Sequence, residues 1–153
     1  MRDVHLTEVK KRTHYMKDLL LADESESIVH TYIEKGNMYS ISYAHEHIGV
    51  CLFLFPDEDT VEIKNIAIRP AYRGRGIGKK VIDLSSHMFK NSGYTEMLVG
   101  TANSSIENLA FYQKSGFRFH EIHKDFFLQY PEPFYENGIQ GLDMVILRKA
   151  LQP

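Results

Sequence analysis

The segment from Glu62 to Lys80 constrains the fold of this chain more than any other stretch of its sequence. The apolar run 61–68 leads into a turn that holds Gly74, Gly76 and Gly78, and an amphipathic helical pattern begins directly after it. Glycines let a backbone approach an anion closely and adopt conformations closed to other residues. The first turn of a helix adds unpaired N–H groups and a positive dipole end. Strand, glycine turn and helix in this order predict a site for a phosphate-containing ligand.

Positive side chains surround the same turn, namely those of Arg73, Arg75, Lys79 and Lys80. The turn is not a P-loop, because no Gly-Lys-Ser or Gly-Lys-Thr sequence is present. It is not a dinucleotide-binding fingerprint either, because neither Gly-x-Gly pair is followed by a third glycine at the required spacing. The pattern that stands is Arg73-x-x-Gly76-x-Gly78. The competing interpretation is an ordinary strand-to-helix turn with solvated arginines.

Length and charge narrow the class of protein. With 153 residues, the chain is predicted to be a single domain over residues 1–153. The net charge of −2 gives no overall attraction to nucleic acid or anionic membranes, so the basic turn favours a small anionic ligand. The single cysteine, Cys51, excludes an internal disulfide, which fits a cytoplasmic protein. No segment is apolar for long enough to span a bilayer, and the first residues lack the apolar core of a signal peptide.

Hydrophobic periodicity predicts the element order α, α, β, β, β, α, β, α, β, β. Apolar residues from Leu6 to Leu20 step by three and four, which predicts a first helix, and a second short helix is expected before Gly36. Strands are expected at 38–45, 48–55, 61–68, 94–100, 117–128 and 142–148, helices at 76–91 and 105–115, and a loop at 129–141. This order indicates an α/β (α+β) fold with a mixed sheet and helices on its faces.

A second motif follows the glycine turn along the chain. It reads Asn108-Leu-Ala-Phe-Tyr112-Gln-Lys-Ser-Gly116-Phe117. Arg-x-x-Gly-x-Gly after a strand, followed by a short helix that ends in Tyr-x-Lys-x-Gly-Phe, resembles the GNAT superfamily of acyl-CoA-dependent N-acyltransferases. The resemblance covers most of the chain. It implies a mostly antiparallel central sheet, flanked by helices, whose middle strands splay apart.

The resemblance also implies acetyl-CoA as the co-substrate. The end of the strand before the turn would pair with the pantetheine arm, here through Ile66, Ala67 and Ile68, and an amide near Ile68 would polarise the acetyl carbonyl. Backbone amides of the glycine turn would hold the pyrophosphate, which in this sequence means Arg73, Gly74, Arg75, Gly76, Ile77, Gly78 and Lys79.

One position departs from the family pattern. Many members have Asn seven residues before the motif tyrosine, where this chain has Ser105. Asn103 and Asn108 are nearby, and either is expected to substitute as a cofactor contact. No metal site is expected, because the eight histidines are not joined by carboxylates or cysteines at ligand spacing.

Two side chains are candidates for proton transfer. Glu62 lies where the resemblance places a general base in the histone-acetylating branch, and such a base would deprotonate an ammonium with a pKa near ~10. On a regular strand Glu62, Lys64, Ile66 and Ile68 would share one face, so an ion pair with Lys64, or simple solvation, is the alternative. Tyr112 matches the residue that often protonates the departing CoA thiolate. The alternative for Tyr112 is an aromatic of the core.

The acceptor side is indicated by residues 129–141, which combine aromatic and acidic side chains. In the family this segment commonly lines the acceptor site, and such groups suit a cationic amine. Solvated loop charges beside a dimer contact are the alternative. We therefore predict acetyl transfer to a primary amine of a small molecule, peptide or protein, by direct attack in a ternary complex. No nucleic-acid or membrane partner is expected, and a homodimer is left open. The competing hypothesis is a non-catalytic acyl-CoA-binding sensor or interaction module.

Overall fold

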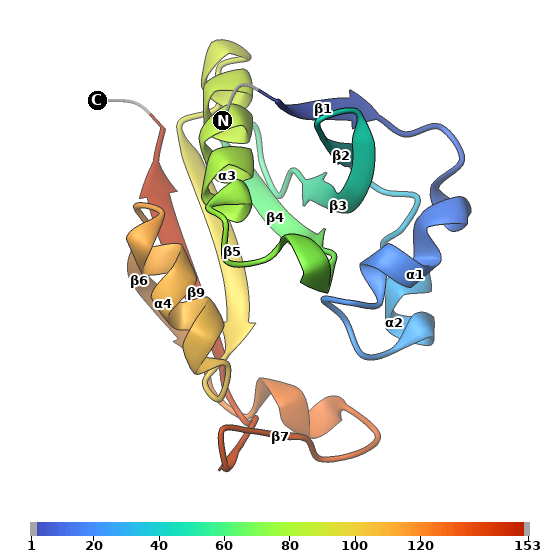
Figure 1. Cartoon of the computed structure of the whole chain (residues 1–153). Coiled ribbons are helices and arrows are strands. Elements are labelled where there is room, and N and C mark those ends of the chain that lie inside the picture. Colours follow the sequence, from blue (N-terminus) through green and yellow to red (C-terminus); the bar gives the residue numbers. More distant parts are fainter. Residues whose placement is uncertain (1–2, 152–153) are drawn as a thin grey trace.

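The computed structural model describes residues 3–151, and within them the main sheet has seven strands in the order β1-β2-β3-β4-β5-β9-β6 (Figure 1). All neighbours are antiparallel except β4 and β5, which are parallel. This confirms the predicted mixed, mostly antiparallel sheet. The strands are β1 (Val4–Glu8), β2 (Asn37–Tyr43), β3 (Glu46–Leu54), β4 (Thr60–Ile68), β5 (Glu96–Ala102), β6 (Arg118–His123) and β9 (Met144–Ala150).

Helices cover both faces of the sheet (Figure 1), and the sheet separates two clusters of buried residues. Helices α3 (Ile77–Asn91) and α4 (Ile106–Lys114) belong with the larger cluster of buried residues, and α1 (Met16–Leu19) and α2 (Glu26–His30) with the smaller one. Strand β3 contributes to both clusters, because successive side chains of a strand point to opposite faces. A strand covered on both faces reads as a continuous apolar run, as 48–55 does.

The N-terminal segment differs from the prediction. A helix was expected from Leu6 to Leu20, but residues 4–8 form β1, followed by a 3-10 turn, η1 (Arg12–Tyr15), and the short α1. Strand β1 pairs antiparallel with β2 along its whole length. Pairing with β2 satisfies a row of backbone groups that a local helix would leave exposed on the edge of β2, and this tertiary gain overrides the helical spacing.

The segment before β9 also differs from the prediction. The strand expected at 117–128 ends at His123, and a 3-10 turn, η3 (Phe126–Gln129), begins after Asp125, which has a positive φ of 61°. The expected loop contains a small hairpin of β7 (Tyr135–Glu136) and β8 (Ile139–Gln140). Asn137 and Gly138 form its two-residue turn with φ values of 55° and 73°, as an Asn-Gly hairpin turn requires.

Strands β4 and β5 pair only over their first halves. The parallel register runs from Thr60 opposite Glu96 to Ile63 opposite Val99, and β4 pairs with β3 alone beyond that point. A β-bulge marks the separation, because Lys64 has no partner between the two pairs that β4 makes with Phe53 and Leu52 of β3. The predicted splay of the middle strands is therefore present, and it opens toward the end of β4.

The bulge changes which side chains of β4 share a face. Glu62, Lys64, Ile66 and Ile68 were predicted to lie on one face, and this is wrong. Ile66 and Ile68 pack on the cluster beneath α3, whereas Lys64 lies 5.3 Å from the centroid of the Tyr32 ring, on the α2 side. Glu62 also faces the α2 side, because its neighbours on both sides are buried in the α3 cluster. The extra residue at the bulge reverses the alternation.

A buried carboxylate joins α1 to the ends of β3 and β4. Arg69 Nε donates to Asp18 Oδ1 at 2.9 Å, and His47 Nε2 lies 2.7 Å from Asp18 Oδ2. Burial raises the pKa of Asp18, but hydrogen bonds from Arg69 and His47 outweigh it and hold that pKa below its usual value of 3.8. Asp18 is therefore charged and paired at neutral pH, and it fixes α1 beside the open end of β4.

We expect Asp18→Asn to lower the free energy of unfolding by about 2 kcal/mol, since Arg69 and His47 lose their charged acceptor but are themselves partly solvated. Because the folded pKa of Asp18 is depressed, its contribution is fully present at neutral pH and is lost as the pH falls through that pKa. Urea unfolding at several pH values measures this. Glu58→Gln, in an exposed turn, is the control, and an equal loss in both variants would contradict the assignment.

Candidate functional site

The glycine turn forms a concentration of unpaired backbone donors at the start of α3. Gly74 and Gly76 have φ values of 76° and 79°, which L side chains rarely adopt. The amides from Gly74 to Lys79 donate to no other group within residues 3–151. Arg73 Nε donates to the carbonyl of Ile68 at 2.8 Å and so ties the turn to the end of β4. The arrangement can bind an anion through main-chain N–H groups and the positive end of the helix dipole.

Helix α4 packs directly on this turn. A β-carbon added to Gly78 would lie 2.9 Å from Cζ of Phe111, so only glycine allows the ring to rest there. The contact places α4, and with it Tyr112, beside the first turn of α3. Gly78 therefore has a packing role in addition to its position among the free amides.

The last residues of β4 present backbone groups to the opening between β4 and β5. The amide of Arg69 donates to the carbonyl of Ile48 at 2.9 Å, toward β3. Alternation along the strand turns the backbone of Ala67 toward β3 as well, and its carbonyl lies against Gly49. The N–H and C=O groups of Ile66 and Ile68 consequently face the other way, into the opening. An extended ligand can add there as a further strand.

Tyr112 has an enclosed ring and an unpaired hydroxyl. The ring packs against Phe111 and Phe117 at centroid distances of 5.1 and 5.6 Å, and the side chain is 6% exposed. Burial raises the pKa of Tyr112 above its usual value. Its hydroxyl makes no hydrogen bond within the described residues, yet the only fully shielded, unpaired side-chain polar atom there is Asn65 Oδ1. The hydroxyl therefore keeps some contact with solvent and is available as a proton donor.

Glu62 is half-buried on the opposite face of the sheet from α3. Burial raises the pKa of Glu62 above 4.5, and the positive charge of Lys64 partly offsets this. No ion pair joins the two side chains within 4.0 Å, so the predicted alternative of a direct Lys64 pair does not occur among the described residues. A carboxylate with a raised pKa is a better proton acceptor near neutral pH.

The two asparagines near the start of α4 have different surroundings. Asn103 Oδ1 accepts from the amides of Leu142 and Asp143 at 2.8 and 3.0 Å, and Asn103 Nδ2 donates to the carbonyl of Gln140 at 3.1 Å. Its amide is therefore engaged with the segment before β9. Asn108 is exposed and donates only to Thr101 Oγ1, at 3.4 Å, within the described part of the chain.

The structure adds a group of residues that sequence reasoning missed, on the same face as Glu62. Tyr32 Oη donates to Asp23 Oδ2 at 2.9 Å and accepts from Asn65 Nδ2 at 3.0 Å. Tyr130 is within electrostatic reach of this group: burial and the negative charges of Asp23 and Glu24 raise its pKa. The signal in the sequence was Asn65, a polar residue inside an apolar strand.

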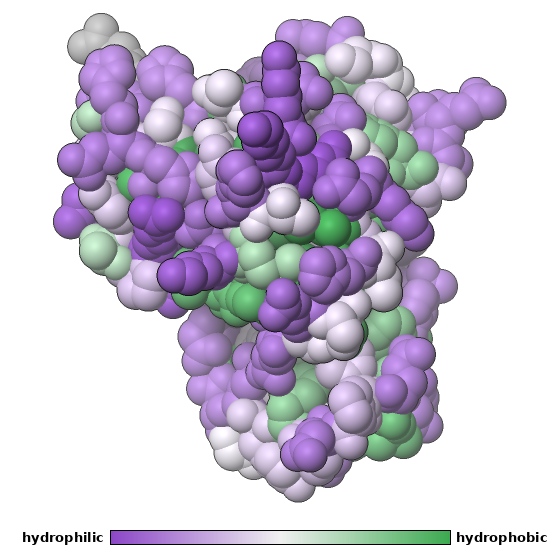
Figure 2. All heavy atoms as spheres, turned by 90° about the vertical axis from the view of Figure 1, so that its right-hand side faces the viewer, coloured by the Kyte–Doolittle hydropathy of each residue, from purple (hydrophilic) through white to green (hydrophobic). Residues whose placement is uncertain are grey.

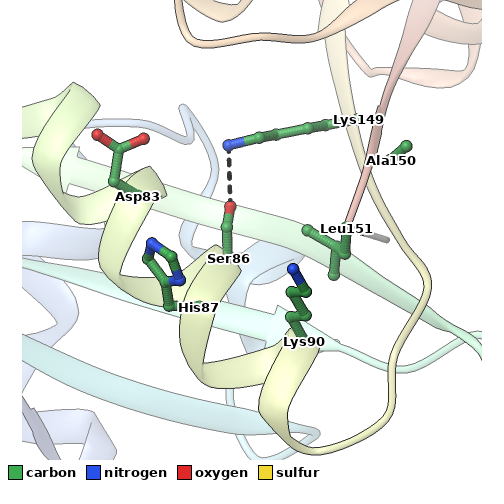
Figure 3. Close-up of a pocket in the computed structure, with 7 residues that line it drawn as sticks. All are labelled: Asp83, Ser86, His87, Lys90, Lys149, Ala150 and Leu151. Carbon is green, nitrogen blue, oxygen red and sulfur yellow. Dashed lines mark hydrogen bonds between the residues drawn. The ribbon is translucent and has the colours of Figure 1, made fainter. Parts of the chain in front are cut away.

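Two hollows lie elsewhere on the molecule. The first, of about 180 Å³, lies between the second half of α3 and the end of β9, where Lys149 Nζ donates to Ser86 Oγ at 3.1 Å (Figure 3). The second, of about 450 Å³, adjoins it beside Gly116 and Phe119. Neither contains a group from the glycine turn, the end of β4 or Glu62, so both lie apart from the candidate site. Residues 3–151 hold no group of three or more His, Cys, Asp or Glu side chains that could bind a metal ion.

Comparison with known proteins identifies relatives of this chain. The model of the acetyltransferase (GNAT) family matches residues 6–117. An uncharacterized N-acetyltransferase of Bacillus subtilis, YvbK, is 44% identical over 130 residues, which are 84% of each chain. A crystal structure of a GNAT family acetyltransferase from Elizabethkingia anophelis with acetyl-CoA bound has a TM-score of 0.91 and 36% identity, covering 98% of this chain and 99% of that one.

A Bacillus subtilis acetyltransferase crystallised in complex with CoA has a TM-score of 0.87 and 40% identity, covering 97% of this chain and 98% of that one. The fold, the glycine turn and the splayed strands are those of an acetyltransferase, and each of these relatives is also named an acetyltransferase. The chain belongs to the acetyltransferase (GNAT) family, and the resemblance drawn from its two motifs is confirmed. Among the described residues, none of the helices combines the length and the apolar character needed to cross a membrane.

The influence of Lys64 on Glu62 can be measured directly. We expect Lys64→Met to raise the pKa of Glu62 further, because the variant keeps an apolar stem but removes the charge that lowers this pKa. Carboxyl ¹³C NMR titration of Glu62 is the measurement. Lys90→Met, which removes an exposed lysine from α3, should leave the titration unchanged. A fall in the Glu62 pKa in Lys64→Met would contradict the described environment.

Proposed function

We propose that this protein transfers an acetyl group from acetyl-CoA to a primary amine, by direct attack in a ternary complex. The observation that carries the proposal is a set of amides, from Gly74 to Lys79, that have no partner within residues 3–151 and lie beside the open backbone edge of Ile66 and Ile68. A diphosphate and an extended amide-containing arm need these two groups of donors next to each other. Family membership, and relatives solved with acetyl-CoA and with CoA, support the choice of this co-substrate.

In this proposal the backbone N–H groups of Gly74 to Lys79 hold the pyrophosphate. The amide of Arg73, which the sequence also predicted there, instead donates to the carbonyl of Pro70 at 3.2 Å. Ile66 and Ile68 pair with the pantetheine arm, and the amide of Ile68 donates to the thioester carbonyl and stabilises the charge that develops on its oxygen. Asn108, exposed at the start of α4, is available for a further polar contact with the arm. Asn103 supports the adjoining loop instead.

Two side chains of the protein would then transfer protons. Glu62, directly or through a water molecule, takes a proton from the acceptor ammonium. The amine nitrogen attacks the thioester carbon and a C–N bond forms. The C–S bond then breaks, Tyr112 gives its proton to the departing thiolate sulfur, and the second proton lost by the nitrogen returns through water to the tyrosine oxygen. A covalent acyl-enzyme is not part of this scheme, because Cys51 is completely buried in the core and burial raises its thiol pKa.

The acceptor would enter on the face of Glu62, between the α1–α2 connection and residues 124–142. Tyr32, Asp23 and Tyr130 lie there, and aromatic rings with a carboxylate suit an amine that arrives as a cation. The acceptor amine belongs to a small molecule, a peptide or a protein. We place the enzyme in the cytoplasm, because its one cysteine is a buried free thiol. A homodimer contact would suit Phe119 and Ile122, which are exposed on the edge strand β6.

Release of free CoA thiol in the presence of acetyl-CoA and a panel of amines tests the function. We expect thiol release that depends on at least one amine and yields the N-acetylated product by mass spectrometry. Gly76→Glu should abolish both activity and acetyl-CoA binding by calorimetry, because it places a carboxylate and a strained side chain in the anion site.

Gly93→Glu is a matched control for this variant. Gly93 also has a positive φ, of 97°, but lies beyond the other end of α3, and a β-carbon there would meet no atom within 4 Å. It carries the same strain and charge away from the turn, so binding should persist. Normal acetyl-CoA binding by Gly76→Glu would overturn the pyrophosphate assignment. Binding without transfer to any amine would favour the non-catalytic acyl-CoA sensor.

We expect Tyr112→Phe to lower kcat by about 100-fold with unchanged acetyl-CoA affinity, because only the proton donor is removed and the buried ring is kept. Steady-state kinetics and calorimetry measure the two quantities. Tyr43→Phe, at a tyrosine of β2 that packs on Tyr72, is the control and should behave as the wild type. If kcat is also unchanged in Tyr112→Phe, Tyr112 is a core residue only.

A further inference from the structure

The hairpin of β7 and β8 is fastened to the start of α4 by one carboxylate. Ser104 Oγ donates to Glu136 Oε1 at 2.9 Å, and Ser105 Oγ lies 2.7 and 2.8 Å from the two oxygens of the same carboxylate. Both serines are buried, at 0% and 6% exposure. A buried hydroxyl without a partner is costly, so these two serines specify an acceptor at this place.

Further hydrogen bonds hold the same hairpin to the same tripeptide, Asn103–Ser105. Asn137 Nδ2, in the hairpin turn, donates to the carbonyl of Ser104 at 3.0 Å. Asn103 Nδ2 donates to the carbonyl of Gln140, at the end of β8. Both strands and the turn are therefore tied to the residues that begin α4. We call these contacts the α4 clasp. Glu136 is the only charged residue that the hairpin contributes to the clasp.

The α4 clasp lies between the two halves of the proposed site. Helix α4 rests on the glycine turn through Phe111 and carries Tyr112. On the other side, the segment that ends in the hairpin holds a row of rings, in which Phe127 lies 5.1 Å from both Tyr130 and Phe134 between centroids. The amide of Gly141 closes the segment by donating to the carbonyl of Phe134. These rings connect Phe134, which adjoins the hairpin, to Tyr130, whose pKa the charge of Asp23 raises.

Figure 2 shows the consequence for the surface. At the height that residues 124–142 occupy in Figure 1, the molecule narrows to a lobe below the main body, and apolar side chains reach its surface. Leu128, Tyr135 and Ile139 are exposed on this segment, at 61%, 64% and 40%. Part of the apolar surface of this segment thus lies in water, so its polar contacts with the start of α4 contribute to holding it in one position.

We infer that Glu136 is a positioning residue for the acceptor: its carboxylate clasps the hairpin to α4 and thereby sets the aromatic segment 126–134 against the acceptor. This inference rests on the proposed function, because it takes the acceptor to bind beside Tyr130. It also explains the departure of the sequence from the family pattern. The position of the usual asparagine holds Ser105, whose hydroxyl is committed to Glu136 rather than to a cofactor.

Kinetics of Glu136→Ala, Glu136→Gln and Glu58→Ala test the inference, using the best amine from the thiol-release panel. We expect Glu136→Ala to raise the KM for the amine by about tenfold, because a charged hydrogen-bond acceptor is lost, with an unchanged KM for acetyl-CoA. Glu136→Gln keeps an oxygen that can accept from both serines, so it should recover most of the affinity. Glu58→Ala removes an exposed carboxylate from a distant turn and should match the wild type.

Hydrogen exchange of residues 126–141 is the second measurement, and it should become faster in Glu136→Ala but not in Glu58→Ala. Faster exchange with an unchanged KM for the amine would overturn the inference, and so would an equal rise in both KM values. If Glu136→Ala does not fold, Ser105→Ala, which keeps the carboxylate and one serine donor, must give the same selective rise in KM.

The proposed function and the inference can fail separately. If the wild type acetylates no amine, the proposed function and the positioning role both fail, whereas failure of the inference alone leaves wild-type transfer intact.

Discussion

The proposed site depends on the interruption of pairing between β4 and β5. Four residues of β4 pair with β5, the bulge at Lys64 follows, and the strands then separate. Buried backbone groups in a sheet are normally paired, so a strand that leaves its neighbour exposes donors and acceptors that need another partner. Ile66 and the amide of Ile68 present such groups, while the Ile68 carbonyl accepts from Arg73 Nε. Within residues 3–151, the glycine turn continues the row of free amides into the start of α3. An extended ligand that ends in a diphosphate satisfies both.

The same bulge sorts side chains between the two faces of the sheet. Before it, Val61 and Ile63 point into the core beneath α3 and Glu62 points away; after it, Ile66 and Ile68 point into that core. The face beneath α3 thus remains apolar through the bend, while Glu62 and Lys64 gather with Tyr32 and Asn65 on the other face. A single extra residue in β4 therefore keeps the face beneath α3 apolar and leaves Glu62 and Lys64 on the opposite, more polar face.

Helix α4 is the second support of the site. The helix begins directly after the serines that bind Glu136. Further along, Phe111 packs on Gly78, and Tyr112 lies next to that contact. Burial raises the pKa values of both Tyr112 and Glu62. In the proposed reaction, the raised pKa keeps the proton on the tyrosine hydroxyl until the thiolate forms, and it makes the glutamate a better proton acceptor. The two groups reach these properties on opposite faces of the sheet.

By itself, the sequence determined what depends on local chemistry: the positive-φ glycines before α3, the helix that ends in Tyr-x-Lys-x-Gly-Phe, most strands, and the family. Only the tertiary structure decided three other features. Residues 4–8 became a strand because β2, far along the chain, offered an edge to pair with. The face of Glu62 depended on a bulge that no periodicity reveals. The pairing of Ser104 and Ser105 with Glu136 depended on a hairpin that returns to α4. Each feature arises from contacts between residues that are distant in sequence. Local sequence patterns carry no information about the energies of such contacts.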